Sequence, residues 1–374
     1  MDDTRFTSMV ERLEQKAAAH PSRYKTEVLL LAVAGFALLA VVLVIAGLGL
    51  AILAGVVLAA LFTGGAALLV LLKFGKLLIF LAVPLWFLIK GSIKALLVRL
   101  PAPSGLELKR AQAPALFEAI DGMRRTLRGP RIHHVKIVDE VNAAMVQRPL
   151  LGMVGPSRNH LLLGLPLLES MTPQEAMAVV AHEYGHLAGA HGRFEAFIYR
   201  QRIAWGTIQQ LADQWEGRVG RWLATWVGRF APYFNAYTFV LARANEYQAD
   251  RASADLVGAA EAQAALKRVN VAGALHGDFM GRTYEGLRTL PEPPADLTLR
   301  WADEARGSPA LADAAPRGLA NALDRRGAPM DTHPPLRQRL AALGDPAVVG
   351  TGTAEGTPAA SPGAGLADPP VQIE

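Results

Sequence analysis

The residues best suited to chemistry form one short pattern, H-E-x-x-H, at residues 182–186. On a helix, His182 and His186 are four residues apart, so both imidazoles lie on one face and can share a metal ion. Glu183 follows the first histidine directly, where its carboxylate can reach a water molecule at the metal instead of the metal itself. The pattern therefore predicts a hydrolytic zinc site.

The residues around this pattern predict a buried helix. Thr172 can cap the helix, Pro173 suits its first position, and Glu175 can close a capping box. The segment 179–181 is Val-Val-Ala, and Leu187 follows the second histidine. Buried histidines and a buried glutamate need partners, and a metal ion would supply them.

A catalytic zinc ion needs a third protein ligand and an open position for water. His191 is a poor choice because on a continued helix it points about 140° away from His186. Glu246 is the better choice, since Glu246 and Asp250 are four residues apart on one face of a second predicted helix. Asp250 would accept a hydrogen bond from the far nitrogen of a ligand histidine.

A di-iron site is the competing metal chemistry, because residues 183–186 also read E-x-x-H. Such sites need a second E-x-x-H on another helix, and the chain contains one only. The chain has no cysteine, which excludes disulfides, thiolate zinc ligands and a cysteine nucleophile. The net charge of +5 comes without a basic run interleaved with aromatic residues, so no nucleic-acid partner is predicted.

The elements that must position these residues include a membrane anchor. From Val28 to Leu72 the chain has no charged residue, about twice the length of one membrane span. This predicts a helical hairpin in a lipid bilayer, preceded by a polar segment over residues 1–26. The composition agrees, with 51% hydrophobic and 19% charged residues.

Lys73 and Lys76 are predicted to end the hairpin, and a second apolar run, Leu77–Ile89, follows them. As a helix it reaches only about 20 Å, so an interfacial or re-entrant segment is predicted, with a third span as the alternative. The anchor is thus placed at residues 27–100. Because both flanks of the hairpin are basic, both should face the cytoplasm, and a third span would reverse the side of the domain.

Residues 101–343 have the composition of a globular domain, mainly helical after Met171. The tail, residues 344–374, is rich in Gly, Ala and Pro and is predicted to be disordered. The predicted class is α+β, with three short strands at Val135–Val138, Ala143–Gln147 and Leu161–Leu163.

Several patterns together resemble the membrane zinc metallopeptidases of the gluzincin type, which include HtpX-like heat-shock proteases and CAAX prenyl proteases. The resemblance covers about residues 101–343. It rests on H-E-x-x-H at 182–186, R-x-x-E-x-x-A-D at 243–250, Asn142-Ala143 with L-G-L-P-L-L at 163–168, and T-H-P-P at 332–335 with Arg339.

The resemblance implies a zincin-like domain with one Zn²⁺ per chain, held by His182, His186 and Glu246, and Glu183 as the catalytic base. A departure concerns the membrane part. HtpX-like proteins usually carry further apolar helices between the two motifs, whereas residues 192–240 here are rich in Arg, Gln, Glu and Trp. A second pair of spans is not expected, nor is an enclosed chamber for prenylated proteins.

The resemblance also implies residues that contact the substrate. Asn142 and Ala143 would lie on the edge strand that pairs with an extended polypeptide. His333 would lie near the cleft, where it steadies the substrate or the developing oxyanion, or else packs in a proline-terminated turn.

Together these features predict a membrane-anchored zinc endopeptidase that acts on misfolded or membrane-proximal polypeptides. It would reside in a bacterial cytoplasmic membrane with its catalytic domain facing the cytoplasm. One alternative is a membrane-anchored binding or chaperone-like module with a latent or structural zinc site. Another is a zinc hydrolase that does not cleave peptides. No oligomeric state is predicted.

Overall fold

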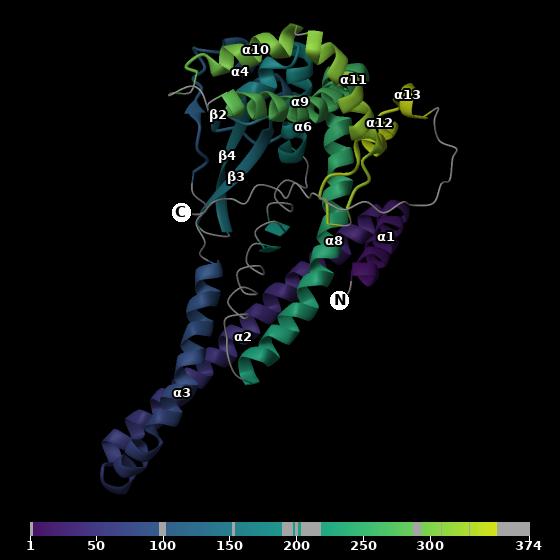
Figure 1. Cartoon of the computed structure of the whole chain (residues 1–374). Coiled ribbons are helices and arrows are strands. Elements are labelled where there is room, and N and C mark those ends of the chain that lie inside the picture. The colour runs from purple at the N-terminus through teal and green to yellow at the C-terminus, as the bar shows by residue number, and fades with distance from the viewer. Residues whose placement is uncertain are drawn as a thin grey trace.

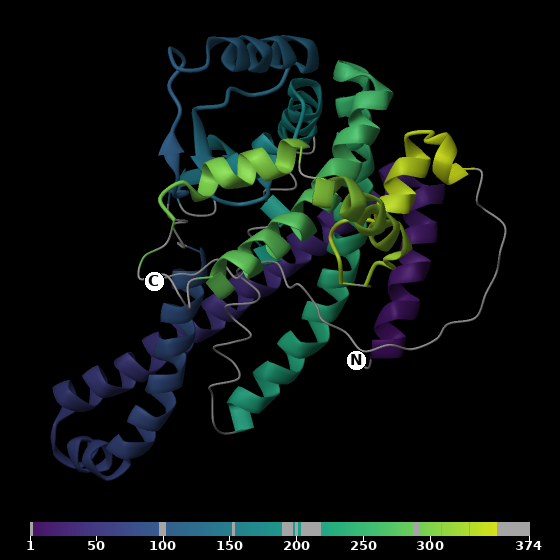
Figure 2. The same ribbon diagram turned by 45° about the horizontal axis from the view of Figure 1, so that its top comes forward.

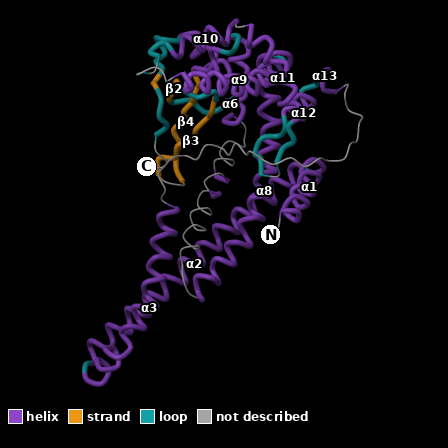
Figure 3. The backbone as a smooth tube through the Cα atoms, viewed as in Figure 1, coloured by secondary structure: helices purple, strands orange, loops and turns teal. Residues whose placement is uncertain are grey.

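Helices dominate the fold, and a small sheet lies at one end of it (Figures 1 and 3). The computed structural model describes residues 3–96, 102–151, 154–188, 197–198, 201–202, 218–286, 292, 294–307, 309–328 and 330–349. The predicted α+β class is confirmed, because a hairpin of long apolar helices precedes a mainly helical domain with four strands.

The hairpin consists of α2 (Pro21–Thr63) and α3 (Gly65–Leu96) and projects away from the rest of the molecule (Figure 1). Gly64 and Gly65 make the turn with φ angles of 61° and 53°, which glycine adopts without a Cβ penalty. Among the described residues, two helical segments are long and apolar enough to cross a membrane, namely α2 and residues 65–83 of α3. Large apolar side chains such as Phe62, 88% exposed, face outward along both helices.

The second apolar run, Leu77–Ile89, is part of α3 and not a separate segment. Lysine is a good helix former, so Lys73 and Lys76 lie within this helix instead of ending the hairpin. The run thus continues the second apolar helix of the hairpin towards the globular part.

The polar segment before the hairpin folds as a helix, α1 (Asp3–Ala19), for which the sequence analysis predicted no structure. In both ribbon views α1 lies against α8, the long helix Arg218–Val257 (Figures 1 and 2). Met9, Val10 and Leu13 are buried in this contact. Helix α1 thus contributes to the packed core around α8.

The sheet has the strand order β1-β2-β4-β3, so β3 is an edge strand. Its strands are β1 (Leu106–Glu107), β2 (His134–Val138), β3 (Ala143–Leu151) and β4 (Val154–Gly164). Strand β4 pairs in parallel with β2 and antiparallel with β3, and β1 pairs antiparallel with β2. The three predicted strands are confirmed, although β3 and β4 are longer than predicted and the short β1 was not predicted.

One face of the sheet packs on helices α4 (Pro114–Leu127) and α6 (Pro173–Ala188). Leu161 and Leu163 of β4 contact Val180 and Tyr184 of α6 in a common core. A short helix, α5 (Leu165–Glu169), connects β4 to α6. The sheet therefore supports the helix that carries the H-E-x-x-H pattern.

Helix α6 begins with the predicted capping box. Glu175 N–H donates to Thr172 Oγ1 at 3.2 Å, and Thr172 N–H donates to Glu175 Oε2 at 2.8 Å. These two bonds satisfy backbone donors that have no partner within the helix. They define where α6 starts and hence where His182 and His186 lie along it.

Helix α6 crosses α8 at Gly185. A Cβ atom at this position would lie 3.1 Å from Ala249 Cα and 3.2 Å from Ala252 Cβ. These contacts are tighter than most Cβ contacts, so a side chain at this position would push the two helices apart. Nearby, Ser253 Oγ donates to Ala178 O at 2.7 Å and links the two helices directly.

The C-terminal helices cover α8 and the end of the sheet (Figure 1). They are α9 (Ala259–Gly286), α10 (Leu297–Gly307), α11 (Pro309–Asp324), α12 (Leu336–Ala342) and α13 (Pro346–Val349). The prediction that a disordered tail begins at Gly344 is wrong at its start. Val348 of α13 is buried against Leu336 and Leu340, and Asp345 pairs with Lys267 at 2.5 Å. Residues 350–374 and His191 lie outside the described residues.

The Thr172→Ala variant should lower the free energy of unfolding by about 1 kcal/mol, because Glu175 N–H loses its capping acceptor. Thr172→Ser keeps the hydroxyl and should match the wild type. Urea unfolding of the detergent-purified chain, followed by tryptophan fluorescence, measures the difference. Equal midpoints for the Ala and Ser variants would show that the capping box does not stabilise α6.

Candidate active site

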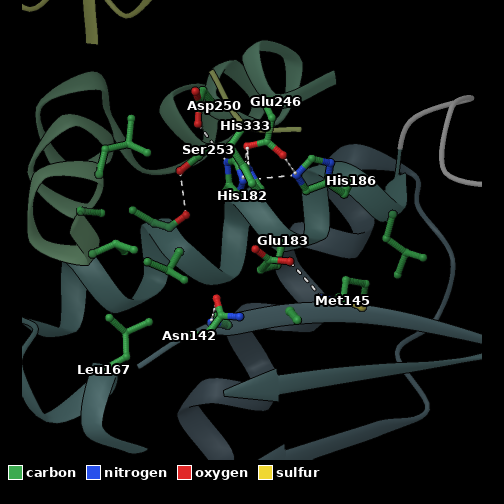
Figure 4. Close-up of a pocket in the computed structure, with 18 of the residues that line it drawn as sticks. Asn142, Met145, Leu167, His182, Glu183, His186, Glu246, Asp250, Ser253 and His333 are labelled. Carbon is green, nitrogen blue, oxygen red and sulfur yellow. Dashed lines mark hydrogen bonds and ion pairs between the residues drawn. The ribbon is translucent and has the colours of Figure 1, made fainter. Parts of the chain in front are cut away.

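Three side chains from two helices converge on one point in the cleft (Figure 4). His182 Nε2 and His186 Nε2 are 3.2 Å apart on α6. Glu246 of α8 places Oε1 3.2 Å from His186 Nε2 and Oε2 3.6 Å from His182 Nε2. Within the part of the chain that the structure describes, no other three His, Asp or Glu side chains come this close together.

These distances fit a zinc ion. Donor atoms bound at 2.0–2.1 Å around a tetrahedral ion lie about 3.3 Å from one another. The two imidazole nitrogens are 3.2 Å apart, and they lie 3.2 and 3.6 Å from different oxygens of the Glu246 carboxylate, close to this value. Two imidazoles and one carboxylate are also a ligand set of catalytic zinc sites. The structure thus brings His182, His186 and Glu246 together as the sequence predicts, and their role as ligands is a prediction.

Asp250 lies behind His182, one turn after Glu246 on α8. Its Oδ1 is 3.0 Å from His182 Nδ1, and its side chain is only 2% exposed. A carboxylate at Nδ1 favours the tautomer that leaves the lone pair of Nε2 directed at the cluster. This is the position that the sequence analysis expected for Asp250.

Arg339 of α12 holds Asp250 from the other side. Its Nε donates to Asp250 Oδ2 at 2.8 Å and its Nη2 to Oδ1 at 2.6 Å. The same Nη2 lies 3.4 Å from Glu246 Oε2. Arg339 belongs to the late motif of the sequence, but no role could be predicted for it because its partner lies 89 residues away in the chain.

Both buried carboxylates of α8 remain ionised. Burial alone would raise the pKa of Glu246, but hydrogen bonds and charge from His186 and His333 hold it well below its usual range. Burial opposes ionisation of Asp250 in the same way, and Arg339 and His182 outweigh it, so its pKa is lowered. Glu246 can therefore offer an anionic oxygen to a divalent cation.

Glu183 belongs to α6 but reaches towards the sheet instead of the cluster (Figure 4). Its Oε2 accepts the backbone N–H of Met145 in β3 at 2.9 Å. The carboxylate thus lies between the three converging side chains and the edge strand. Glu183 was predicted to lie beside the candidate metal ligands, but Met145 was not predicted as its partner because a backbone N–H carries no sequence signal.

The open edge of β3 runs along the cleft. Gly164 N–H donates to Asn142 O at 2.8 Å, so the backbone of Asn142 bonds to β4. Because antiparallel pairs alternate, Ala143 and Met145 direct their backbone groups away from β4. The Asn142 side chain lies in the cleft, where its Oδ1 accepts Ala143 N–H at 2.9 Å.

His333 joins the cluster from the segment before α12. Its Nδ1 lies 2.9 Å from Glu246 Oε2, and this hydrogen bond raises the pKa of His333. The side chain is 63% exposed, so the ring also faces the cleft. The structure therefore brings His333 to the predicted site, in contact with a predicted ligand.

The cleft that contains these groups has a volume of about 1100 Å³. It extends from the histidines past Glu183 and Asn142 (Figure 4). Its far wall is apolar and comes from α5, α6 and α9, through Leu167, Val179, Ala262, Ala265, Leu266 and Val269. The volume is sufficient for several residues of an extended polypeptide.

Comparison with known proteins gives a family match. The profile described as peptidase family M48 matches residues 150–347. The chain is similar to Protease HtpX of Haemophilus ducreyi, with 29% identity over 38% of this chain and 57% of that protein. Protease HtpX of Salmonella arizonae and of Salmonella newport are each 34% identical, over 28% of this chain and 42% of theirs. The chain spans about half the length of the curated relatives it matches.

The Asp250→Asn variant should bind zinc about 10- to 100-fold more weakly, because an amide does not fix the His182 tautomer as a carboxylate does. Competition with a chromophoric chelator on the detergent-purified protein measures the affinity. Asp255→Asn, at an exposed position of the same helix, is the matched control and should bind as the wild type. Equal affinities for the two variants would rule out this role of Asp250.

Proposed function

Because the chain belongs to peptidase family M48, we propose that it is a membrane-anchored, zinc-dependent endopeptidase. The observation that carries the proposal is the position of Glu183, between the His182–His186–Glu246 cluster and the edge strand. A zinc ion at the cluster would lower the pKa of a water molecule and polarise the scissile carbonyl. The donor set and its spacing support this cofactor, one ion per chain.

In the proposed reaction Glu183 takes a proton from the attacking water and passes it to the leaving amine. Asp250 keeps His182 in the required tautomer, and Arg339 keeps Asp250 in place. With its Nδ1 engaged by Glu246, His333 has only Nε2 to offer to the substrate or to the developing oxyanion. The proposed base and the groups that support it thus all line the same cleft.

The substrate would bind as an additional strand on β3. Its carbonyl would then compete with Glu183 for the N–H of Met145, which Glu183 binds at 2.9 Å. Displacement from Met145 would free the carboxylate for proton transfer. Recognition through backbone groups would admit many sequences, which suits a protease for misfolded proteins.

The anchor suggests where the substrates lie. Helix α1 and the domain with the cleft both lie at the open end of the hairpin, so both belong on one side of the bilayer (Figure 1). The basic flanks favour the cytoplasmic side of a bacterial membrane. We accordingly divide the chain into an anchor within residues 27–100 and a catalytic domain that follows it, and assign a role in membrane-protein quality control.

The Glu183→Gln variant should retain one zinc ion per chain and lose casein cleavage by at least about 100-fold, because the amide cannot accept the proton. Zinc content and cleavage are read on the same detergent-purified samples. Glu169→Gln, in α5 and outside the residues that line the cleft, serves as the control for loss of a carboxylate. Full activity in Glu183→Gln would refute the mechanism, and zinc without cleavage by the wild type would favour the alternative of a latent binding module.

The topology can be tested by cysteine labelling, since the chain has no native cysteine. Ser22→Cys and Ser104→Cys lie at the open end of the hairpin, and Thr63→Cys lies beside its turn. In right-side-out vesicles an impermeant maleimide should label only Thr63→Cys, because the basic flanks stay inside. Labelling of Ser22→Cys or Ser104→Cys from the outside would overturn the proposed orientation.

A further inference from the structure

We propose that α1 is a positioning element of the active site, which acts through an ion pair between Glu14 and Arg243. Arg243 in turn holds the segment that presents His333 to Glu246. This inference rests on the proposed function for the role of His333. It concerns a part of the chain that lies outside the residues matched by the family profile.

Helix α1 is fixed on α8 by buried apolar side chains. Met9, Val10 and Leu13 are 8%, 2% and 7% exposed and share a core with α2 and α8. Tyr24, at the start of α2, donates its hydroxyl to Tyr237 O of α8 at 2.9 Å. Burial of three large apolar side chains places α1 firmly on α8, with Glu14 facing Arg243.

Arg243 connects α1 to the segment before α12. Its Nη1 pairs with Glu14, its Nε donates to Asp331 O at 2.8 Å, and its Nη2 donates to Ala328 O at 2.6 Å. The side chain is only 13% exposed. Because a guanidinium group is planar and rigid, the ion pair with Glu14 restricts the direction of the two hydrogen bonds from Arg243 to Asp331 O and Ala328 O.

The segment that Arg243 holds leads directly to the cluster. Asp331 Oδ2 accepts Ala328 N–H at 2.7 Å, and Asp331 N–H donates to Ala328 O at 3.0 Å, which closes a local turn. Two residues later, His333 reaches Glu246 Oε2 at 2.9 Å. Arg243 also lies one helical turn before Glu246 on α8. Helix α8 therefore positions both the arginine that holds the segment and the glutamate that His333 contacts.

The consequence is a physical connection between the N-terminal helix and the cleft. Glu14 pairs with Arg243, and neither residue lines the cleft. Glu14 compensates the charge of Arg243 and restrains its direction. Loss of this restraint should loosen Ala328 and residues 330–333, and it should weaken the hold on His333 while leaving the rest of the fold in place.

The experiment compares Glu14→Gln with Glu11→Gln, a matched change at an exposed position of the same helix. The first readout is limited trypsin digestion of the metal-free, detergent-purified full chain. Arg325 and Arg326 are exposed and directly precede the held segment. Cleavage after them should be about fivefold faster in Glu14→Gln, with unchanged cleavage elsewhere. Equal rates in the two variants would overturn the proposal.

The second readout is a double-mutant cycle on peptide cleavage. Glu14→Gln should lower kcat about fivefold with KM and zinc content unchanged, and it should have no further effect in a His333→Ala background. An equal loss in both backgrounds would mean that Glu14 has only a general structural role, contrary to the proposal. If the wild type cleaves no peptide, the proposed function fails, and the trypsin rates alone decide whether α1 holds the segment.

Discussion

The close contact between α6 and α8 is the constraint on which the site depends. His182 and His186 come from one helix and Glu246 from the other, so the distances among them follow from how near the two backbones lie. Gly185 allows that approach, since a side chain there would meet Ala249 and Ala252. Gly185 therefore contributes to the packing of the two helices, whereas His182 and His186 on either side of it are the predicted metal ligands.

Charge compensation extends from this crossing to distant parts of the chain. Glu246 and Asp250 are buried, and buried carboxylates require partners. Arg339 of α12 compensates Asp250, and Arg243, one turn before Glu246, is compensated by Glu14 of α1. The two arginines thus join α1 and α12 to α8 by ion pairs.

The local part of the site could be predicted from sequence because it follows helical spacing. Residues four apart share a helix face, and this rule alone pairs His182 with His186 and Glu246 with Asp250. The capping box at Thr172 is equally local. The hairpin and three strands follow from runs of apolar residues, although α3 continues through the two lysines that were predicted to end it.

The remainder depends on contacts between distant segments. Met9, Val10 and Leu13 indicate an apolar face of α1, but no local sequence pattern predicts that α8 is the element that covers this face. The bond from Arg339 to Asp250 spans 89 residues, and the partner of Glu183 is a backbone N–H. Val348 lies within a Gly, Ala and Pro-rich stretch and is buried only because Leu336 and Leu340 lie nearby.

The most direct test of the central claim is X-ray absorption at the zinc edge on the zinc-loaded, full-length protein. The geometry of His182, His186 and Glu246 predicts two imidazole nitrogens and at least one carboxylate oxygen at about 2.0–2.2 Å. The carboxylate contribution should disappear in Glu246→Ala. A zinc shell without imidazole, or one that Glu246→Ala leaves unchanged, would contradict the assignment of this cluster as the metal site.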